Sequence, residues 1–475
     1  MKKTILSVLI ACLLLTGCSP TEFIVFNDDF ALTTPAPEQI DPVEAERIDS
    51  YTEKAQLFLP SVSGQAFIPF DVKIEVTADV IYEQALAEAL IAFEVPDNGM
   101  QLFPEGTKLL SCVKSGDTVI INLSKEVLEA SAQQLFMIRS AFAKTLCGCD
   151  VDFVDVLAEN RALPLTDLPT GAMALPESSP SAGWAHLSAE ELIHSPTRIV
   201  TLYRIARDSG LLIPQTKEIT FEDDLVTPVL EALMREESTY TAFLAGIALK
   251  LTGYELSEDG SSLRLNFDGN FSSVLERSGI SMSGLCAALT CTLCGFMPKL
   301  EGIKLYIGDG QVAHIEDLAP EDGIFTPAMF TDDIGTFVNI YMTAPDGKLA
   351  RLYRALPAAQ TASVRSTLKL LFDEPKEYET GVVRLIPEEL TESDLLGIRI
   401  SKGEAVVDLS EAFYAGCQRL TETQERNLVY AFVNMLTDRP DVTCVRFLIN
   451  GEHADRLAAG ISIASPLMRN PGLIE

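Results

Sequence analysis

The order of hydrophobic and polar positions repeats three times along the chain. In each copy two β-rich runs precede a helical pattern, two further β-rich runs precede a second helical pattern, and a last apolar run closes the copy. The front strands are clearest at 200–203 and 338–341, and the later hairpins turn at a glycine, as in 113–124 and 400–410. This order predicts an α+β fold made of three tandem ββαββαβ units.

The spacing between the copies supports this prediction. The strand after the glycine turn ends at Asn122, Asn266 and Asp408 in the three copies, so equivalent positions recur after 144 and 142 residues. A near-constant period is typical of repeated structural units.

Each copy has a second helix whose apolar residues recur every three or four positions. We expect the two helices of a copy to cover one face of a small mixed sheet, giving an α/β sandwich. The final strands are expected at 153–157, 302–307 and 442–449. The apolar positions of the second helices are Leu135, Ile138, Phe142, Leu146, Leu285, Leu289, Leu293, Leu428, Phe432 and Leu436.

The first residues are typical of a bacterial lipoprotein leader. Two lysines precede an apolar stretch at 5–15, which is too short to span a bilayer. The stretch ends in Leu-Thr-Gly before Cys18, which resembles a lipobox. The resemblance implies cleavage after residue 17 and a diacylglycerol on Cys18, with palmitate-type chains holding the protein at the extracytoplasmic face of the cell membrane. A cleaved signal peptide followed by a chance cysteine is the alternative.

Turn-rich stretches separate the copies and set the expected domain boundaries. The expected parts are a signal peptide at 1–17, a lipidated flexible tether at 18–50, a first domain at 51–160, a linker at 161–195, a divergent second domain at 196–316, a linker at 317–335, and a third domain with a C-terminal tail at 336–475.

The composition fits folded domains and argues against nucleic acid as a partner. The 475 residues are 47% hydrophobic and 22% charged, with a formal net charge of −32. Phosphate binding depends on lysine and arginine, whereas an acidic surface attracts cations or basic partner faces.

The third copy carries the most distinctive sequence. Its strand end at 407–410 reads Val-Asp-Leu-Ser, a helix follows at 421–436, and its last strand and turn occupy 445–452. The first copy agrees at 104–110 and 122–124, whereas the second keeps only the pattern. Together these segments resemble the GerMN domain of sporulation and germination lipoproteins. The resemblance implies a fold similar to the ring-building domains of secretion systems, a role in assembly and partner binding, and no catalytic residues, cofactor or metal.

Cysteine spacing offers one candidate site. Cys291 and Cys294 have the CxxC spacing of redox and zinc sites, and Cys286 precedes them. The first copy places Cys147 at the position equivalent to Cys294, at the end of the second helix, and a free cysteine packs as a small hydrophobe. We therefore interpret these cysteines, together with Cys149, as packing residues.

Two Ser-x-x-Lys matches do not form a catalytic set. Ser111 with Lys114 and Ser366 with Lys369 lack the Lys-Thr-Gly element that accompanies this motif in penicillin-binding enzymes. The chain also has no HExxH and no Gly-x-Ser-x-Gly sequence.

Neither the histidines nor a group of aspartates indicates a metal site. Asp150, Asp152 and Asp155 lack the spacing of a calcium loop, so we interpret them as a solvated strand start. Trp184 lies in the first linker, where packing against a domain face is favoured over a contact site. The four dispersed histidines are His186, His194, His314 and His453.

The sequence therefore predicts a non-enzymatic, membrane-anchored scaffold or adaptor of a sporulation or germination envelope assembly. Its expected partners are the membrane, extracytoplasmic envelope proteins or other copies of itself, with sheet edges as one route to association. A solute-binding lipoprotein of a transporter is the first alternative, and a cell-wall enzyme is the second.

Overall fold

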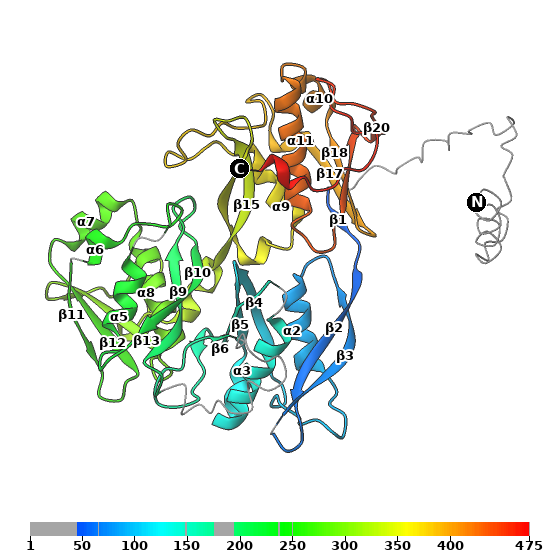
Figure 1. Ribbon diagram of the computed structural model, residues 1–475. Helices are drawn as coiled ribbons and strands as arrows, with labels where there is room; N and C mark the ends of the chain where they lie inside the picture. Colours follow the sequence, from blue (N-terminus) through cyan, green and yellow to red (C-terminus); the bar gives the residue numbers. More distant parts are fainter. Residues whose placement is uncertain are drawn as a thin grey trace, which may run out of the picture. The chain divides into compact units, whose positions relative to one another are not determined.

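The computed structural model describes residues 45–64, 66–147, 150–174, 194–235, 238–248 and 250–474. The expected signal peptide, Cys18 and the expected tether up to residue 44 lie outside these residues, as do Cys149, Trp184 and His186. Over the described residues the protein is a mixed α+β structure with several small sheets (Figure 1).

The first segment, residues 51–162, begins with a long hairpin and ends in a mixed sheet. Its elements are β2 (Tyr51–Pro60), β3 (Phe67–Val76), α2 (Tyr82–Ala92), β4 (Leu109–Ser115), β5 (Thr118–Leu123), η1 (Lys125–Glu129), α3 (Ala132–Leu146), β6 (Phe153–Ala158) and β7 (Arg161–Ala162). β4 pairs antiparallel with β5, β5 pairs parallel with β6, and a short strand β8 (Met173–Ala174) also joins β6.

The second segment, residues 197–311, has the same strand pairing. Its elements are β9 (Thr197–Ile205), β10 (Leu212–Thr220), α5 (Thr227–Met234), α6 (Ala245–Ala248), β11 (Leu251–Leu256), β12 (Ser262–Phe267), α7 (Phe271–Ser278), α8 (Met282–Phe296), β13 (Gly302–Ile307) and β14 (Gly310–Gln311). β11 pairs antiparallel with β12, and β12 pairs parallel with β13. Two short helices, η2 (Glu321–Gly323) and η3 (Pro327–Asp333), lead to the third segment.

The third segment, residues 335–453, repeats this pairing in β17, β18 and β19. Its elements are β15 (Gly335–Thr343), β16 (Leu349–Pro357), η4 (Ala358–Gln360), α9 (Val364–Lys369), η5 (Leu370–Phe372), η6 (Glu392–Asp394), β17 (Leu395–Ser401), β18 (Glu404–Leu409), α10 (Glu411–Cys417), α11 (Glu422–Leu436), β19 (Cys444–Ile449) and β20 (Glu452–His453). A last turn, η7 (Pro471–Leu473), follows in the C-terminal tail.

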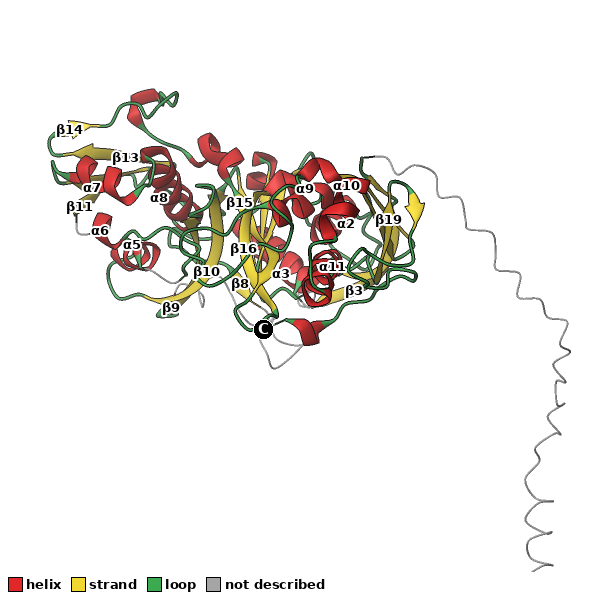
Figure 2. Ribbon diagram, turned by 90° about the horizontal axis from the view of Figure 1, so that it is seen from above, coloured by secondary structure: helices red, strands yellow, loops and turns green. Residues whose placement is uncertain are grey.

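The sheets differ from the expected single sheet with helices on one face. In each segment the front two strands form a separate two-stranded sheet. The second helices lie between this hairpin and the second sheet. α3 contacts both β2 and β6. α8 contacts both β9 and β13, and Figure 2 shows it between them. The reason is that these helices are apolar on more than one side; α8, for example, contains no charged residue.

The helix starts follow from local side chains. Ser131, Ser281 and Thr421 each precede a second helix, and each hydroxyl accepts a hydrogen bond from the backbone N–H three residues on. Thr421 is therefore the N-cap of α11.

The equivalent positions at the strand ends have a structural role in two of the three segments. Asn122 Oδ1 accepts the backbone N–H of Asn160 at 2.7 Å, and Asp408 Oδ1 accepts that of Gly451 at 2.8 Å. Both side chains thus hold the turn that follows the last strand. Asn266 instead accepts a bond from Arg264 Nε at 2.6 Å.

The expected tether ends earlier than residue 50. Strand β1 (Arg47–Ile48) pairs parallel with β17, as Figure 1 shows. Glu46 accepts bonds from the hydroxyl of Ser363 at 2.9 Å and from the backbone N–H of Arg365 at 3.1 Å. Residues 46–49 are therefore fixed to the third segment, because a free sheet edge and a helix start supply partners that a short linker can use.

Among the described residues, no single helix has the length and apolar character needed to cross a membrane, although α7 and α8, which meet at 99°, would qualify if joined.

Candidate interaction site

The cysteines of the second segment lie in its core. Cys286, Cys291 and Cys294 are free thiols in α8, packed among leucines and phenylalanines. Burial raises the pKa of Cys286 and of Cys294 to about 12, and raises the pKa of Cys291 well above its usual value. Buried, protonated thiols are poor nucleophiles and poor metal ligands, which agrees with the packing interpretation. Cys147, at the equivalent helix end, is half-buried.

The two Ser-x-x-Lys matches place their side chains in unrelated surroundings. Ser111 and Lys114 are three positions apart on β4, so their side chains point to opposite faces. Lys114 Nζ pairs with Glu83 at 2.6 Å, and Lys369 Nζ pairs with Glu392 at 3.3 Å. Each lysine is therefore paired with a carboxylate.

The histidines and aspartates do not converge on a metal site. His194 and His314 are exposed, and no group of three His, Cys, Asp or Glu side chains within the described ranges could hold a metal ion. Asp150 and Asp152 are exposed as expected. The solvated interpretation is wrong for Asp155, which is buried against the second segment.

Strand β5, in the second sheet of the first segment, is buried on both faces. Val119 and Ile121 of β5 belong to the core of the first segment, whereas Ile120 belongs to the core of the second. Two polar contacts accompany this junction. Thr201 donates its hydroxyl to Asp155 Oδ2 at 2.6 Å, and the hydroxyls of Thr118 and Thr216 lie 2.9 Å apart. Burial raises the pKa of Asp155 despite the bond from Thr201.

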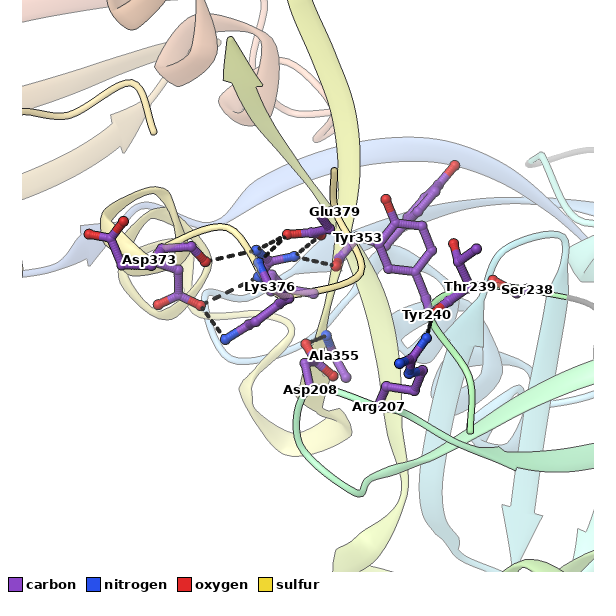
Figure 3. Close-up of polar contacts among 12 residues, drawn as sticks. Arg207, Asp208, Ser238, Thr239, Tyr240, Tyr353, Ala355, Asp373, Lys376 and Glu379 are labelled. Carbon is purple, nitrogen blue, oxygen red and sulfur yellow. Dashed lines mark hydrogen bonds and ion pairs between the residues drawn. The ribbon is translucent and has the colours of Figure 1, made fainter. Parts of the chain in front are cut away.

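The second and third segments meet beside a buried ion pair. Arg354 donates to both carboxylate oxygens of Glu379, at 2.5 and 2.8 Å, and both side chains are at most 2% exposed. Figure 3 shows Glu379 of this pair, with Asp373 and Lys376 nearby, next to Asp208 of the second segment. Asp208 Oδ2 accepts the backbone N–H of Ala355 at 2.9 Å.

Aromatic rings cover the other side of this junction. Tyr240 of the second segment has its ring centroid 5.1 Å from that of Tyr353, 5.9 Å from that of Tyr378 and 6.1 Å from that of Phe337. The guanidinium of Arg207 lies 4.3 Å from the Tyr378 ring centroid, which is a cation–π distance. The junction thus combines ring packing, a hydrogen bond from a backbone N–H to the Asp208 carboxylate and a cation–π contact, and this combination fixes orientation as well as contact.

A cavity of about 1190 Å³ opens where the three segments meet. The first segment contributes Tyr51 and Tyr82, the second contributes Gln215 and Tyr240, and the third contributes Tyr353. This volume exceeds the roughly 300–1,000 Å³ of typical small-molecule pockets. It could therefore receive a peptide segment or a large solute.

The lining of this cavity is acidic. Among the described residues that line it, Lys114 and Arg439 are the two basic ones, and each is already paired, with Glu83 at 2.6 Å and with Asp441 at 2.9 Å. Burial, and next the charge of Asp441, raises the pKa of Tyr51 to about 12. Among the described residues, no histidine or cysteine lines the cavity. The lining carboxylates are Glu53, Glu83, Asp117, Asp150, Asp438 and Asp441.

The sequence interpretation missed the residues that join the segments. Arg354 had a usable signal, since it follows Ala350 and Leu352 at the inward positions of β16. A charged residue in such a row requires a buried partner. Asp208 and Tyr240 lie in loops and gave no pattern that could have identified them.

Comparisons with known proteins give one family. The family model described as sporulation and spore germination, Germane, matches residues 56–164 and 339–455. No curated protein matches the chain. Among solved structures, the tandem GerMN domains of the sporulation protein GerM from Bacillus subtilis are 15% identical, with a TM-score of 0.23, over 58% of this chain and 97% of that chain. The first GerMN domain of the same protein is 19% identical, also at 0.23, over 28% of this chain and 97% of that chain.

Proposed function

Because the chain is a GerMN-domain protein with tandem copies of that domain, we propose that it is a non-enzymatic scaffold of a sporulation or germination envelope assembly. The observation that carries this proposal is the way the two matched segments are joined. They are linked through the second segment by buried contacts, with Ile120 in one shared core and Asp208 bonded across the next junction. Such contacts hold several binding surfaces in a fixed geometry.

The second segment is, in this proposal, a divergent third copy of the ββαββαβ unit. The family model does not extend to it. Three observations support the idea: the near-constant spacing, the same pairing of β11, β12 and β13, and the hydroxyl cap at Ser281 that matches Ser131 and Thr421. A scaffold with three copies presents three related surfaces, which adds avidity for a multivalent partner.

The proposal also places the protein at the extracytoplasmic face of the cell membrane, anchored through a diacylglycerol on Cys18. The leader sequence supports this location. Growth with an alkyne-tagged palmitate should label the wild-type protein, whereas Cys18→Ala should abolish labelling and release the protein from the membrane fraction. Cys12→Ala, within the leader, is the matched control and should leave labelling intact.

In-cell photo-crosslinking tests the scaffold function directly. A crosslinking amino acid at exposed positions of each segment, for example Leu110, Phe243 and Val383, should capture one recurring envelope protein or other copies in sporulating cells. Recovery of uncrosslinked monomer from growing and sporulating cells alike would exclude the scaffold.

The cavity favours a solute-binding lipoprotein as the second candidate function. A ligand that binds only the folded state raises the melting temperature by mass action. A screen of metabolites and cell-wall fragments should give no shift if the scaffold proposal is right. A shift that disappears in Tyr240→Ala would favour the solute-binding alternative instead.

A further inference from the structure

The three second sheets share one edge position, and the structure treats it differently in each segment. This edge is formed by β4 in the first segment, β11 in the second and β17 in the third. In the first segment, β15 and α2 both contact β4. β17 is extended by β1, which adds a parallel strand at its edge.

The edge of β11 is open. Within the described ranges no strand pairs with β11 on the side away from β12. Four of its six residues are exposed, and among them Tyr254 is 37% and Leu256 is 41% accessible. An exposed edge with apolar side chains is a template for another strand unless lysine, proline or a bulge blocks it. The bulge of β11 lies at its start, between Leu251 and Gly253, and leaves Tyr254 to Leu256 regular.

The occupied edge in the third segment shows what the open one accepts. Arg47 of β1 lies opposite Arg399, and Ile48 lies opposite Ile400. By their pairing with the central strand, the equivalent residues of the second segment are Glu255, opposite Arg264, and Leu256, opposite Leu263. A strand with a basic residue followed by an apolar one would therefore place its basic residue opposite the negative charge of Glu255 at β11. At β17, by contrast, Arg47 of β1 lies opposite the positive charge of Arg399.

We infer that the β11 edge is a docking site for an extended segment of a protein partner, which adds as a parallel strand with a basic residue opposite Glu255 and an apolar residue opposite Leu256. Main-chain hydrogen bonds supply the affinity in this mode of binding, and the alternating side chains supply the specificity. The inference rests on the proposed scaffold function and names the chemistry of one partner contact.

A separate partner is a better occupant than the β1 strand of a second copy. In each molecule, hydrogen bonds between Glu46 and the residues Ser363 and Arg365 hold β1 to the third segment of the same chain. Arg365 also donates to the carbonyl of Ala45 at 2.9 Å. Exchange between copies would break these bonds, whereas a free segment has no such contacts to lose.

Hydrogen–deuterium exchange on the full-length protein in detergent tests the inference. The probe is a synthetic peptide with the sequence of residues 44–50, Glu-Ala-Glu-Arg-Ile-Asp-Ser, which has the required basic and apolar pair. Binding should slow exchange at the amides of 252–256 and leave β17 unchanged. Slower exchange at neither strand, or displacement of β1 from β17 by the peptide, would overturn the inference.

A charge exchange supplies the second test. Glu255→Arg should weaken binding of the probe about three- to tenfold, since cross-strand charge pairs have modest energies. A peptide with glutamate in place of its arginine should bind this variant as well as the original peptide binds wild type. Glu258→Arg, in the exposed turn after β11, is the matched control and should change affinity less than twofold.

Two outcomes separate this inference from the proposed function. Crosslinks to an envelope partner that map away from β11 would retain the scaffold and overturn the β11 site. Concentration-dependent dimers with β1 exchanged, detected by sedimentation and by crosslinks from residue 47 to β11, would also overturn it, because the occupant would then be a second copy.

Discussion

The second sheets of the first and second segments have the same strand pairing but bury different amounts of their surface. In β5 the residues Val119, Ile120 and Ile121 are all buried, so both faces of this strand lie in a core. In β12 the buried Leu263 and Leu265 alternate with half-exposed Arg264. The difference teaches that the shared strand pairing requires apolar residues only on the inner face of the sheet. The residues on the outer face determine whether a segment packs against its neighbour.

The outer row of each sheet shows the same contrast in chemical terms. Ile120 is flanked by Val113 and by Asp155, which takes a hydrogen bond from the second segment. Arg264 is flanked by Glu255 and Lys304. Three neighbouring charged residues can stay hydrated at little cost in free energy. Apolar residues in the same place, if no neighbouring segment covered them, would form an exposed apolar surface that favours association.

The same substitution at two equivalent positions should give the largest difference. Ile120→Gln removes apolar contacts and buries an amide without a partner, so we expect a loss of about 3–5 kcal/mol in the free energy of unfolding. Arg264→Gln, on the hydrated face, should change it by less than about 1 kcal/mol. Urea denaturation measures both. Similar losses in the two variants would mean that the outer faces do not differ as described.

A second contrast separates the two junctions, since the first is mainly apolar and the second adjoins an ion pair. Arg354→Met leaves Glu379 buried without its partner and should destabilise the protein by about 3 kcal/mol. The double variant Arg354→Met with Glu379→Met should recover much of this loss, because no buried charge remains. A double variant as unstable as the single one would show that packing, and not charge, dominates at this position.

The carboxyl of Asp155 gives the first junction a pH dependence. Its pKa is raised in the folded protein, so the folded state binds this proton more tightly than the unfolded state does. Stability contributed by the protonated form is therefore lost as the pH rises above the unfolded value of about 3.9. Asp155→Asn keeps an oxygen for Thr201 and cannot ionise. Its advantage in unfolding free energy over wild type should grow between pH 4 and 7; a constant difference would contradict this assignment.

The smallest expected change in the free energy of unfolding comes from a substitution on the outer, hydrated face of the second segment's sheet. The guanidinium of Arg264 lies 3.8 Å from the ring centroid of Tyr306. Tyr306→Leu removes this cation–π contact at a partly exposed site and should cost about 0.5–1 kcal/mol. Thermal denaturation of Tyr306→Leu in the wild-type and Arg264→Gln backgrounds should show the loss only in the former.

Much of the fold could be predicted from the sequence because its patterns are local. The glycine turns and the hydroxyl cap of Thr421 depend on neighbours within a few residues. The recurrence of the strand ends is visible when the copies are compared with one another. The sequence also indicates the contrast in burial between the two sheets. β5 contains a continuous apolar run, as expected for a strand buried on both faces, whereas apolar and polar residues alternate in β12.

Other features depended on long-range contacts and could not be predicted in this way. Asp155 reads as a solvated residue until Thr201, 46 positions away, is placed beside it. The helices were expected to cover one face, although the uncharged sequence of α8 indicated burial on more sides. The partner of Arg354 lies 25 residues further on, in a loop without periodicity.

The short strand β1 also has a mechanical consequence. A pull on the chain from its N-terminal side reaches residues 46–49 before it reaches β2, so the third segment bears the load first. The bonds of Glu46 and the pairing of Arg47 and Ile48 with β17 must break before the pulling force reaches the first segment. The first segment is thus protected from tension by its attachment to the third segment, which follows much later along the chain.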